Sequence, residues 1–90
     1  MLAKRFEGRV YLLSGAARGL GAAQARRIVA EGGSVLIGDV LHDTGRALAA
    51  ELGPRAVFQP LDVTRAEDWQ QAVAAAQALG PVHGLVNNAG

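Results

Sequence analysis

The stretch from Ser14 to Gly21 has the composition and spacing of an anion-binding turn. It reads Ser-Gly-Ala-Ala-Arg-Gly-Leu-Gly and joins an apolar run, Val10–Leu13, to an Ala-rich segment, 22–30, that contains no Gly or Pro. The apolar run is typical of a short buried strand and the Ala-rich segment of a helix. A strand, a glycine turn and a helix in this order gather backbone N–H groups and the positive end of a helix dipole at one point. The sequence therefore predicts a site for an anion, above all a pyrophosphate.

The three glycines of this turn have separate predicted tasks. We expect Gly15 to adopt backbone angles that a Cβ would forbid, Gly19 to let a ligand approach the main chain, and Gly21 to let the helix lie close to the strand. Their spacing is G-x-x-x-G-x-G rather than the more familiar G-x-G-x-x-G. The predicted binding residues also include those between the glycines: Ala17, Arg18 and Leu20.

A carboxylate stands where such a site would need one. Asp39 comes directly after a second apolar run, Ser34–Gly38, and about 20 residues beyond the glycine turn. A carboxylate at this distance can accept hydrogen bonds from the two hydroxyls of an adenine ribose, and it would repel a 2′-phosphate. An aspartate after a strand is, on its own, more often a solvated turn residue. After this glycine turn we favour the binding role, and with it NAD over NADP.

The composition indicates a single α/β domain and excludes several kinds of partner. The chain has 90 residues, half of them hydrophobic, with 12 glycines, a net charge of +1 and no cysteine. The Ala, Val and Leu content suits a parallel sheet with closely packed helices. We expect no nucleic-acid partner, because no basic patch is present, and no membrane span, because no apolar run approaches ~20 residues. We expect no metal site and, lacking cysteines and a signal core, a cytoplasmic location.

The rest of the chain alternates between helical and strand patterns. We predict helices over 20–31, 44–52 and 64–79, the first ended by Gly32-Gly33, and further strands over 56–59 and 82–86. Asp43 is the predicted N-cap of the second helix. Thr64 and Glu67 are predicted to form a capping box at the start of the third. The apolar face predicted for that helix contains Ala66, Trp69, Val73 and Ala76. Right-handed crossovers then make the sheet parallel.

Two further motifs follow the predicted third and fourth strands. Asp62-Val63 comes after the third, and Asn87-Asn88-Ala89-Gly90 closes the fourth. Together with the glycine turn and Asp39, these motifs resemble the short-chain dehydrogenases/reductases in their compact, single-domain form, and the resemblance runs the length of the chain. It implies the first half of a Rossmann sheet with strand order 3-2-1-4. Residues 1–90 would thus be the N-terminal part of one dinucleotide-binding domain, apparently truncated.

The resemblance also assigns cofactor contacts. It implies that the Asp62 side chain meets the adenine amino group and that the backbone of Val63 meets a ring nitrogen; the alternative, that Asp62 only caps local structure ahead of Thr64, is compatible with this role. Asn88, Ala89 and Gly90 would line the cofactor cleft, whereas Asn87 would be structural. Arg18 stands where NADP-preferring members often carry a basic residue, although many NAD-dependent members have it too. Val40, a further predicted contact, stands where NADP binders often place an Arg.

The family activity implied is hydride transfer between NAD and a secondary alcohol or ketone, with a hydroxysteroid as one substrate class, in a homo-oligomer (dimer or tetramer). The family's catalytic Ser, Tyr and Lys lie beyond the N-N-A-G motif. Tyr11, expected to be buried in the first strand, and Lys4 in the tail cannot replace them, so we predict no catalytic residue in this chain. The alternatives are a non-catalytic NAD-binding regulatory module and an inactive fragment. An isolated chain ending here is expected to be marginally stable, to aggregate, or to dimerise through its fourth strand.

Overall fold

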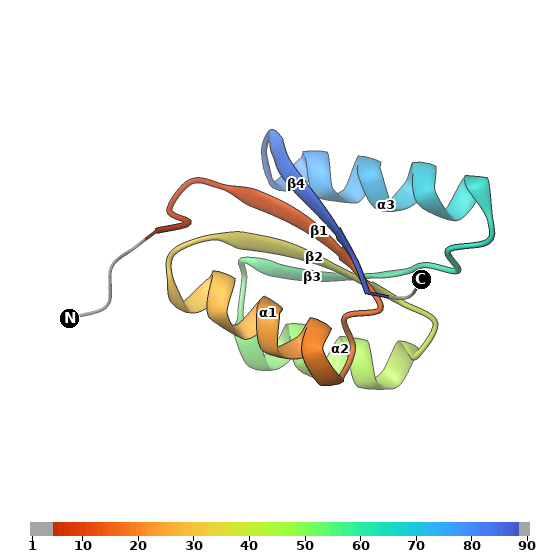
Figure 1. Cartoon of the computed structure of the whole chain (residues 1–90), viewed down its shortest axis with the longest axis horizontal. Coiled ribbons are helices and arrows are strands. Elements are labelled where there is room, and N and C mark those ends of the chain that lie inside the picture. Colours follow the sequence, from red (N-terminus) through yellow and green to blue (C-terminus); the bar gives the residue numbers. More distant parts are fainter. Residues whose placement is uncertain (1–4, 89–90) are drawn as a thin grey trace.

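Strands and helices alternate along the chain as the sequence predicts. The computed structural model describes residues 5–88 (Figure 1). The elements are β1 (Val10–Ser14), α1 (Gly19–Ala30), β2 (Ser34–Asp39), α2 (His42–Leu52), β3 (Ala56–Pro60), α3 (Ala66–Leu79) and β4 (Val82–Asn87). The four strands form one parallel sheet in the order β3-β2-β1-β4. This confirms the predicted Rossmann-type architecture and strand order.

The helices cover both faces of the sheet, with α1 and α2 on one side and α3 on the other (Figure 1). Alternate residues of β1 and β2 point to opposite faces. Leu13 and Ile37 pack in the core cluster that contains Ala25 of α1, whereas Leu12 and Leu36 belong to the cluster on the α3 side. Burying each such side chain stabilises the fold by about 1.5–3 kcal/mol. The two central strands are therefore rigid, and their carboxyl ends are held in fixed positions.

The C-terminus of α1 ends in the predicted glycine cap. Gly32 has a φ of 94°, and its N–H donates to the carbonyl of Val29, while the N–H of Gly33 donates to the carbonyl of Ile28. This pair of bonds is a Schellman motif. The guanidinium of Arg55 also donates to the Val29 carbonyl at 3.1 Å. The cap turns the chain directly into β2.

The predicted N-cap of α2 is wrong. The helix begins at His42 with Leu41 as its N-cap residue, so Asp43 lies inside the first turn. The Asp39 carboxylate accepts the N–H of Leu41 at 3.1 Å, which turns the chain immediately after β2. The carbonyl of Leu41 then accepts the N–H of Gly45 at 2.9 Å. Because this turn lies at Leu41, the helix begins one residue ahead of Asp43, which therefore cannot occupy the N-cap position.

The predicted capping box at the start of α3 is also wrong. Arg65 is the N-cap residue, and no side chain caps the helix. The hydroxyl of Thr64 donates instead to Oδ1 of Asp62 at 2.6 Å, and Glu67 pairs with Arg65. The Asp62 carboxylate is a charged acceptor for this hydroxyl, and charge-assisted hydrogen bonds are stronger than neutral ones. The hydroxyl therefore stabilises the loop that precedes the helix and does not cap the helix itself.

The inward face of α3 differs from the predicted one. Ala72 and Ala76 are buried, Trp69 is half-buried, and Val73 and Ala66 are exposed. The buried stripe follows the spacing of Trp69, Ala72, Ala76 and Leu79, one step around the helix from the prediction. Two alanines at the centre of this stripe let the helix lie close to the sheet.

β4 is the outer strand beside β1 and carries a register shift. Val10 pairs with Val82 but Tyr11 pairs with Gly84, so His83 lies opposite no residue. Nδ1 of His83 accepts the N–H of Val10 at 3.2 Å, a role that the sequence did not indicate. Leu85 on this strand is 58% exposed. Tyr11 is half-buried rather than buried: its ring packs edge-on against Phe6, but its neighbour on β4 is Gly84, which has no side chain to cover it.

Within residues 5–88, no helix combines the length and apolar character needed to cross a membrane.

Candidate functional site

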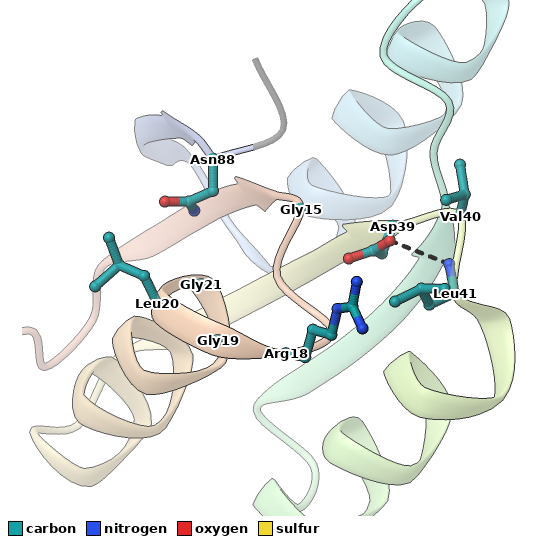
Figure 2. A pocket seen from close by; sticks show the side chains of 9 residues that line it. All are labelled: Gly15, Arg18, Gly19, Leu20, Gly21, Asp39, Val40, Leu41 and Asn88. Carbon is teal, nitrogen blue, oxygen red and sulfur yellow. Dashed lines mark hydrogen bonds between the residues drawn. The ribbon is translucent and has the colours of Figure 1, made fainter.

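A cleft opens at the carboxyl ends of β1 and β2. It encloses a cavity of about 430 Å³, and all nine residues that line it are shown in Figure 2. Except for Leu41, all of them had been predicted from the sequence; they are Gly15, Arg18, Gly19, Leu20, Gly21, Asp39, Val40, Leu41 and Asn88. Ala89 and Gly90, the other predicted contacts at this end of β4, lie outside the described residues. A crevice beyond the strand ends is the usual ligand site of open α/β sheets.

Asp39 is fixed in the wall of this cleft. Its side chain ends β2 and is only 9% exposed. Oδ2 accepts the N–H of Ala17 at 3.0 Å, and Oδ1 accepts the N–H of Leu41 at 3.1 Å. Ala17 is thus buried in the turn and acts through its backbone rather than by lining the cavity. The two bonds tie the glycine turn to the end of β2 and hold a negative charge beside the cleft.

The N-terminus of α1 faces the same cleft without a cap. Its N-cap residue, Arg18, makes no capping hydrogen bond with its side chain, and the first turn contains no acidic residue. By contrast, the first turns of α2 and α3 carry Asp43 and Asp68, respectively. Open N–H groups at the positive end of the helix dipole suit an anion. The Arg18 side chain extends towards Asp39 and Leu41 (Figure 2).

The glycines take the conformations that the spacing predicts. Gly15 and Gly19 have φ angles of 62° and 61°, in the region that favours glycine. A Cβ on Gly19 would meet no heavy atom within 4 Å, so the space beside it is open to a ligand. A Cβ on Gly21 would lie 2.5 Å from the carbonyl oxygen of Gly15, which shows how closely the helix packs on the turn.

The end of β4 is tied to β1 and α1 through Asn87 and Asn88. The buried hydroxyl of Ser14 donates to Oδ1 of Asn87 at 2.6 Å. Asn88 donates its backbone N–H and its Nδ2 to the Ser14 carbonyl, at 3.1 and 3.2 Å. Nδ2 also donates to Oε1 of Gln24 at 3.0 Å. Asn87 therefore has the structural role expected of it, and Asn88 is held at the cleft by bonds from two other elements.

Replacing Ser14 by alanine tests this tie. We expect the variant to lose about 1 kcal/mol of unfolding free energy, because it removes the hydrogen bond that the buried Ser14 hydroxyl donates to Asn87. Urea unfolding of the complete protein would measure the change. Ser34→Ala is a suitable control, because the Ser34 hydroxyl makes no hydrogen bond within residues 5–88. Equal losses in the two variants would contradict a specific role for Ser14.

A second, smaller cavity adjoins the first on the far side of Asp39. Its volume is about 200 Å³, and its lining consists of Gly15, Asp39, Val40, Leu61, Asp62 and Val63. Oδ1 of Asp62 accepts both the hydroxyl and the N–H of Thr64, at 2.6 and 2.9 Å. The local capping role and a ligand-binding role of Asp62 are thus compatible, since its Oδ2 accepts no hydrogen bond from the described residues.

These bonds lower the pKa of Asp62. The largest cause is the Thr64 hydroxyl, followed by the Thr64 N–H, with the positive charge of Arg65 adding a smaller effect. We expect Thr64→Val to raise this pKa, whereas Thr64→Ser should preserve it. Carbon-detected NMR titration of the carboxyl group would measure both. Because a lowered pKa stabilises the fold above the unfolded-state value, that contribution should disappear as the pH falls through the folded-state pKa. An unchanged titration in Thr64→Val would refute the assignment.

Two functional residues escaped the sequence analysis. Leu41 lines the cleft and donates its N–H to Asp39; the spacing of two residues is that of an Asx turn and could have revealed it. Gln24 of α1 is the other: its Oε1 accepts Nδ2 of Asn88 and so links α1 to the end of β4. No local pattern indicates that contact, because it joins residues far apart in the sequence.

Comparison with known proteins identifies the family. The sequence profile of the short chain dehydrogenases matches residues 9–90. The chain is 51% identical over 87 residues to a 3-alpha-(or 20-beta)-hydroxysteroid dehydrogenase of Mycobacterium tuberculosis, covering 96% of this chain and 34% of that protein. It is 40% identical over 90 residues to a 3-beta-hydroxysteroid dehydrogenase of Comamonas testosteroni, covering 99% of this chain and 35% of that protein. The chain thus spans about a third of the length of these relatives.

Solved structures resemble this chain in both fold and sequence. The crystal structure of a 3-hydroxyacyl-CoA dehydrogenase type-2 from Mycobacterium avium matches with a TM-score of 0.89 and 42% identity, over 94% of this chain and 34% of that one. A 3-ketoacyl-(acyl-carrier-protein) reductase from Brucella melitensis, complexed with NADH, matches with a TM-score of 0.84 and 34% identity, over 88% of this chain and 33% of that one. The profile match, the relatives and the sheet order agree, and the chain belongs to the short-chain dehydrogenase family of oxidoreductases.

Proposed function

We propose that this chain forms the cofactor-binding part of an NAD-dependent oxidoreductase that interconverts a secondary alcohol and a ketone. The observation that carries the proposal is the placement of Asp39. Its carboxylate is held in the wall of the cleft by the N–H groups of Ala17 and Leu41, beside the uncapped N-terminus of α1. An anion site and a ribose-binding carboxylate next to each other match the pyrophosphate and the neighbouring ribose of an adenosine diphosphate group.

The described residues suit each part of that group. The N–H groups at the start of α1 would bind the pyrophosphate, Asp39 would bind the ribose hydroxyls, and the smaller cavity beside Asp62 would receive the adenine. Leu20 and Val40, at the mouth of the cleft, are 70% and 59% exposed. Large apolar side chains flanking a polar cleft are a usual feature of ligand sites, because a bound molecule covers them. Both residues support the same placement.

The charge arrangement favours NAD over NADP. A 2′-phosphate on the adenine ribose would approach the Asp39 carboxylate, and like charges in a partly buried site repel strongly. Arg18 lies close enough to the cleft to line it, but it is exposed and so its charge is more screened than that of Asp39. The NADH in the Brucella melitensis structure is consistent with this choice.

The cofactor would supply a two-electron hydride acceptor or donor. Oxidation of the alcohol to the ketone would remove a hydride from the carbinol carbon and a proton from the hydroxyl, with the proton passing to a base; reduction would reverse both transfers. Tyr11 would not provide that base, because it does not line the cleft and its ring packs against Phe6. Lys4 lies outside the described residues. We place the proton-transfer groups in the part of the family domain that this chain does not span.

A hydroxysteroid or another bulky apolar alcohol is the proposed substrate class. The support comes from the names of two relatives, a 3-alpha-(or 20-beta)-hydroxysteroid dehydrogenase and a 3-beta-hydroxysteroid dehydrogenase. We also propose a cytoplasmic homo-oligomer, a dimer or a tetramer, as for the family in general.

Cofactor turnover in the complete polypeptide that carries this sequence tests the proposal. We expect NADH oxidation with 3-keto or 20-keto steroids as substrates, with NADPH much less effective. Cyclohexanone is the control for a small ketone. Saturable NADH binding without turnover of any ketone would instead favour a regulatory nucleotide-binding module. Absence of NADH binding would reject both readings of the site.

A further inference from the structure

We propose that Trp69 of α3 is a positioning residue that fixes the base-binding segment of the cleft. This segment, residues 61–65, joins β3 to α3 and is called the base loop below. The inference rests on the proposed function, because it concerns the same nucleotide site. It goes further in assigning selectivity for the base to a side chain that lies outside both cavities of the site.

Four of the five backbone N–H groups of the base loop donate hydrogen bonds within the described chain. The N–H of Leu61 donates to the carbonyl of Asp39, and that of Asp62 donates to Oδ2 of Asp68 at 2.9 Å. The N–H of Thr64 donates to Oδ1 of Asp62, and that of Arg65 to the Asp62 carbonyl. Within the described chain, Val63 alone in this loop has an N–H without a partner. Its N–H is therefore free for a ligand.

Trp69 holds the peptide unit that follows Val63. Its indole Nε1–H donates to the Val63 carbonyl at 2.9 Å, and its ring packs, half-buried, against the core cluster that contains Leu61. The N–H of the same peptide unit, which belongs to Thr64, is held by Asp62. The peptide between Val63 and Thr64 is thus hydrogen-bonded at both its C=O and its N–H, to Trp69 and to the Asp62 carboxylate. These two bonds limit rotation about Val63 and fix the orientation of the Asp62 side chain.

Two polar groups of the base loop that have no hydrogen-bond partner within the described chain, one donor and one acceptor, belong to residues that line the smaller cavity. Val63 offers its N–H, Asp62 offers Oδ2, and both residues line the cavity of about 200 Å³. Adenine presents the complementary pair on one edge, a ring nitrogen that accepts and an adjacent amino group that donates. Hypoxanthine presents the reverse pair, a ring N–H and a carbonyl oxygen, so it would place donor against donor and acceptor against acceptor. A rigid base loop should therefore bind adenine better than hypoxanthine.

Calorimetric titration of the complete protein with NAD and with nicotinamide hypoxanthine dinucleotide tests the role of Trp69. The two ligands differ only in the base. We expect wild type to prefer NAD by about tenfold or more, since each reversed polar pair leaves buried groups unsatisfied. In Trp69→Phe, which removes the indole N–H, we expect NAD binding to weaken about fivefold or more and the preference to fall towards one. Leu79→Ala is the matched control, because it weakens the packing of the same helix at its far end.

The outcomes separate this inference from the proposed function. If wild type binds neither dinucleotide, both are overturned. If wild type prefers NAD and Trp69→Phe keeps the same preference, only the role of Trp69 is overturned. A general loss of stability would weaken both ligands equally, as expected for Leu79→Ala. If Trp69→Phe does not fold, replacement of Trp69 by benzothienylalanine keeps the size of the ring while removing the N–H, and the same loss of preference is expected.

Discussion

Replacing Asp39 by asparagine should lower the affinity for NAD by about tenfold to a hundredfold while leaving the affinity for NADP unchanged or improved. A hydrogen bond to a charged group contributes about 1.5–3 kcal/mol, and about 1.4 kcal/mol corresponds to a factor of ten in binding. The asparagine removes the charge that two ribose hydroxyls would share. It also removes the repulsion of a 2′-phosphate. Fluorescence titration of the complete protein with NADH and NADPH would measure both affinities.

The paired measurement separates recognition from damage to the turn. Asp39 also accepts the N–H groups of Ala17 and Leu41, so the variant loses some local order. That loss would weaken both cofactors by the same factor. Asp43→Asn is a suitable control, because it removes an exposed carboxylate from the first turn of α2 and leaves the cleft intact. Equal losses of NADH and NADPH in Asp39→Asn would remove the case for Asp39 as the selector.

Gly21→Ala should destabilise the protein by about 3 kcal/mol or more. The added Cβ would lie 2.5 Å from the Gly15 carbonyl oxygen and 2.6 Å from Cα of Ala16. Both neighbours are backbone atoms of a turn that is held by Asp39, so they cannot move aside as a flexible side chain would. Overpacking of a rigid core typically costs about 1–3 kcal/mol, and a clash with backbone lies at or above that range. Denaturant unfolding would measure the loss.

Two other glycines serve as controls for Gly21. At Gly45 the nearest atoms to an added Cβ all belong to the Phe58 ring, a partly buried side chain that can move more easily than backbone, so Gly45→Ala should cost less. At Gly19 there is open space, but φ is 61°, so Gly19→Ala should cost about 1 kcal/mol of backbone strain and place a methyl group in the cleft. If Gly21→Ala loses no more unfolding free energy than Gly45→Ala, the backbone of the glycine turn must be able to shift and accommodate the added methyl group.

The fold and most of the cleft were predictable because they depend on local backbone properties. The positive φ angles at Gly15 and Gly19 and the cap at Gly32 require glycine, and the sequence displays glycine there. Asp39 was found from its distance to the turn, since both follow strands that end at one edge of the sheet. The start of α2 was not predictable in the same way: Asp43 and Asp39 compete to organise the same turn, and only the contact with Leu41 decides between them.

The base loop marks the limit of such reasoning. The sequence predicts that the Thr64 hydroxyl accepts a backbone N–H at the start of α3, but the hydroxyl donates to Asp62 instead. Trp69 was interpreted as packing, and it does pack, but its indole also bonds a carbonyl six residues earlier. Hydrophobic periodicity ranks residues by burial and says nothing of which polar atom a half-buried ring presents. These pairings depend on how α3 lies over the sheet, which no local pattern specifies.

Because of the strand order, the central strand β1 can pair with β4 only after most of the chain has been made. Val10 of β1 pairs with Ser34 of β2 and with Val82 of β4, so the second pairing closes a loop of about 70 residues. Pairings between such distant residues form slowly. At a synthesis rate of roughly 5–20 residues per second, β4 leaves the ribosome roughly 4–14 seconds after β1. Throughout that interval, the β1 edge that later pairs with β4 stays unpaired, although it lies inside the finished sheet.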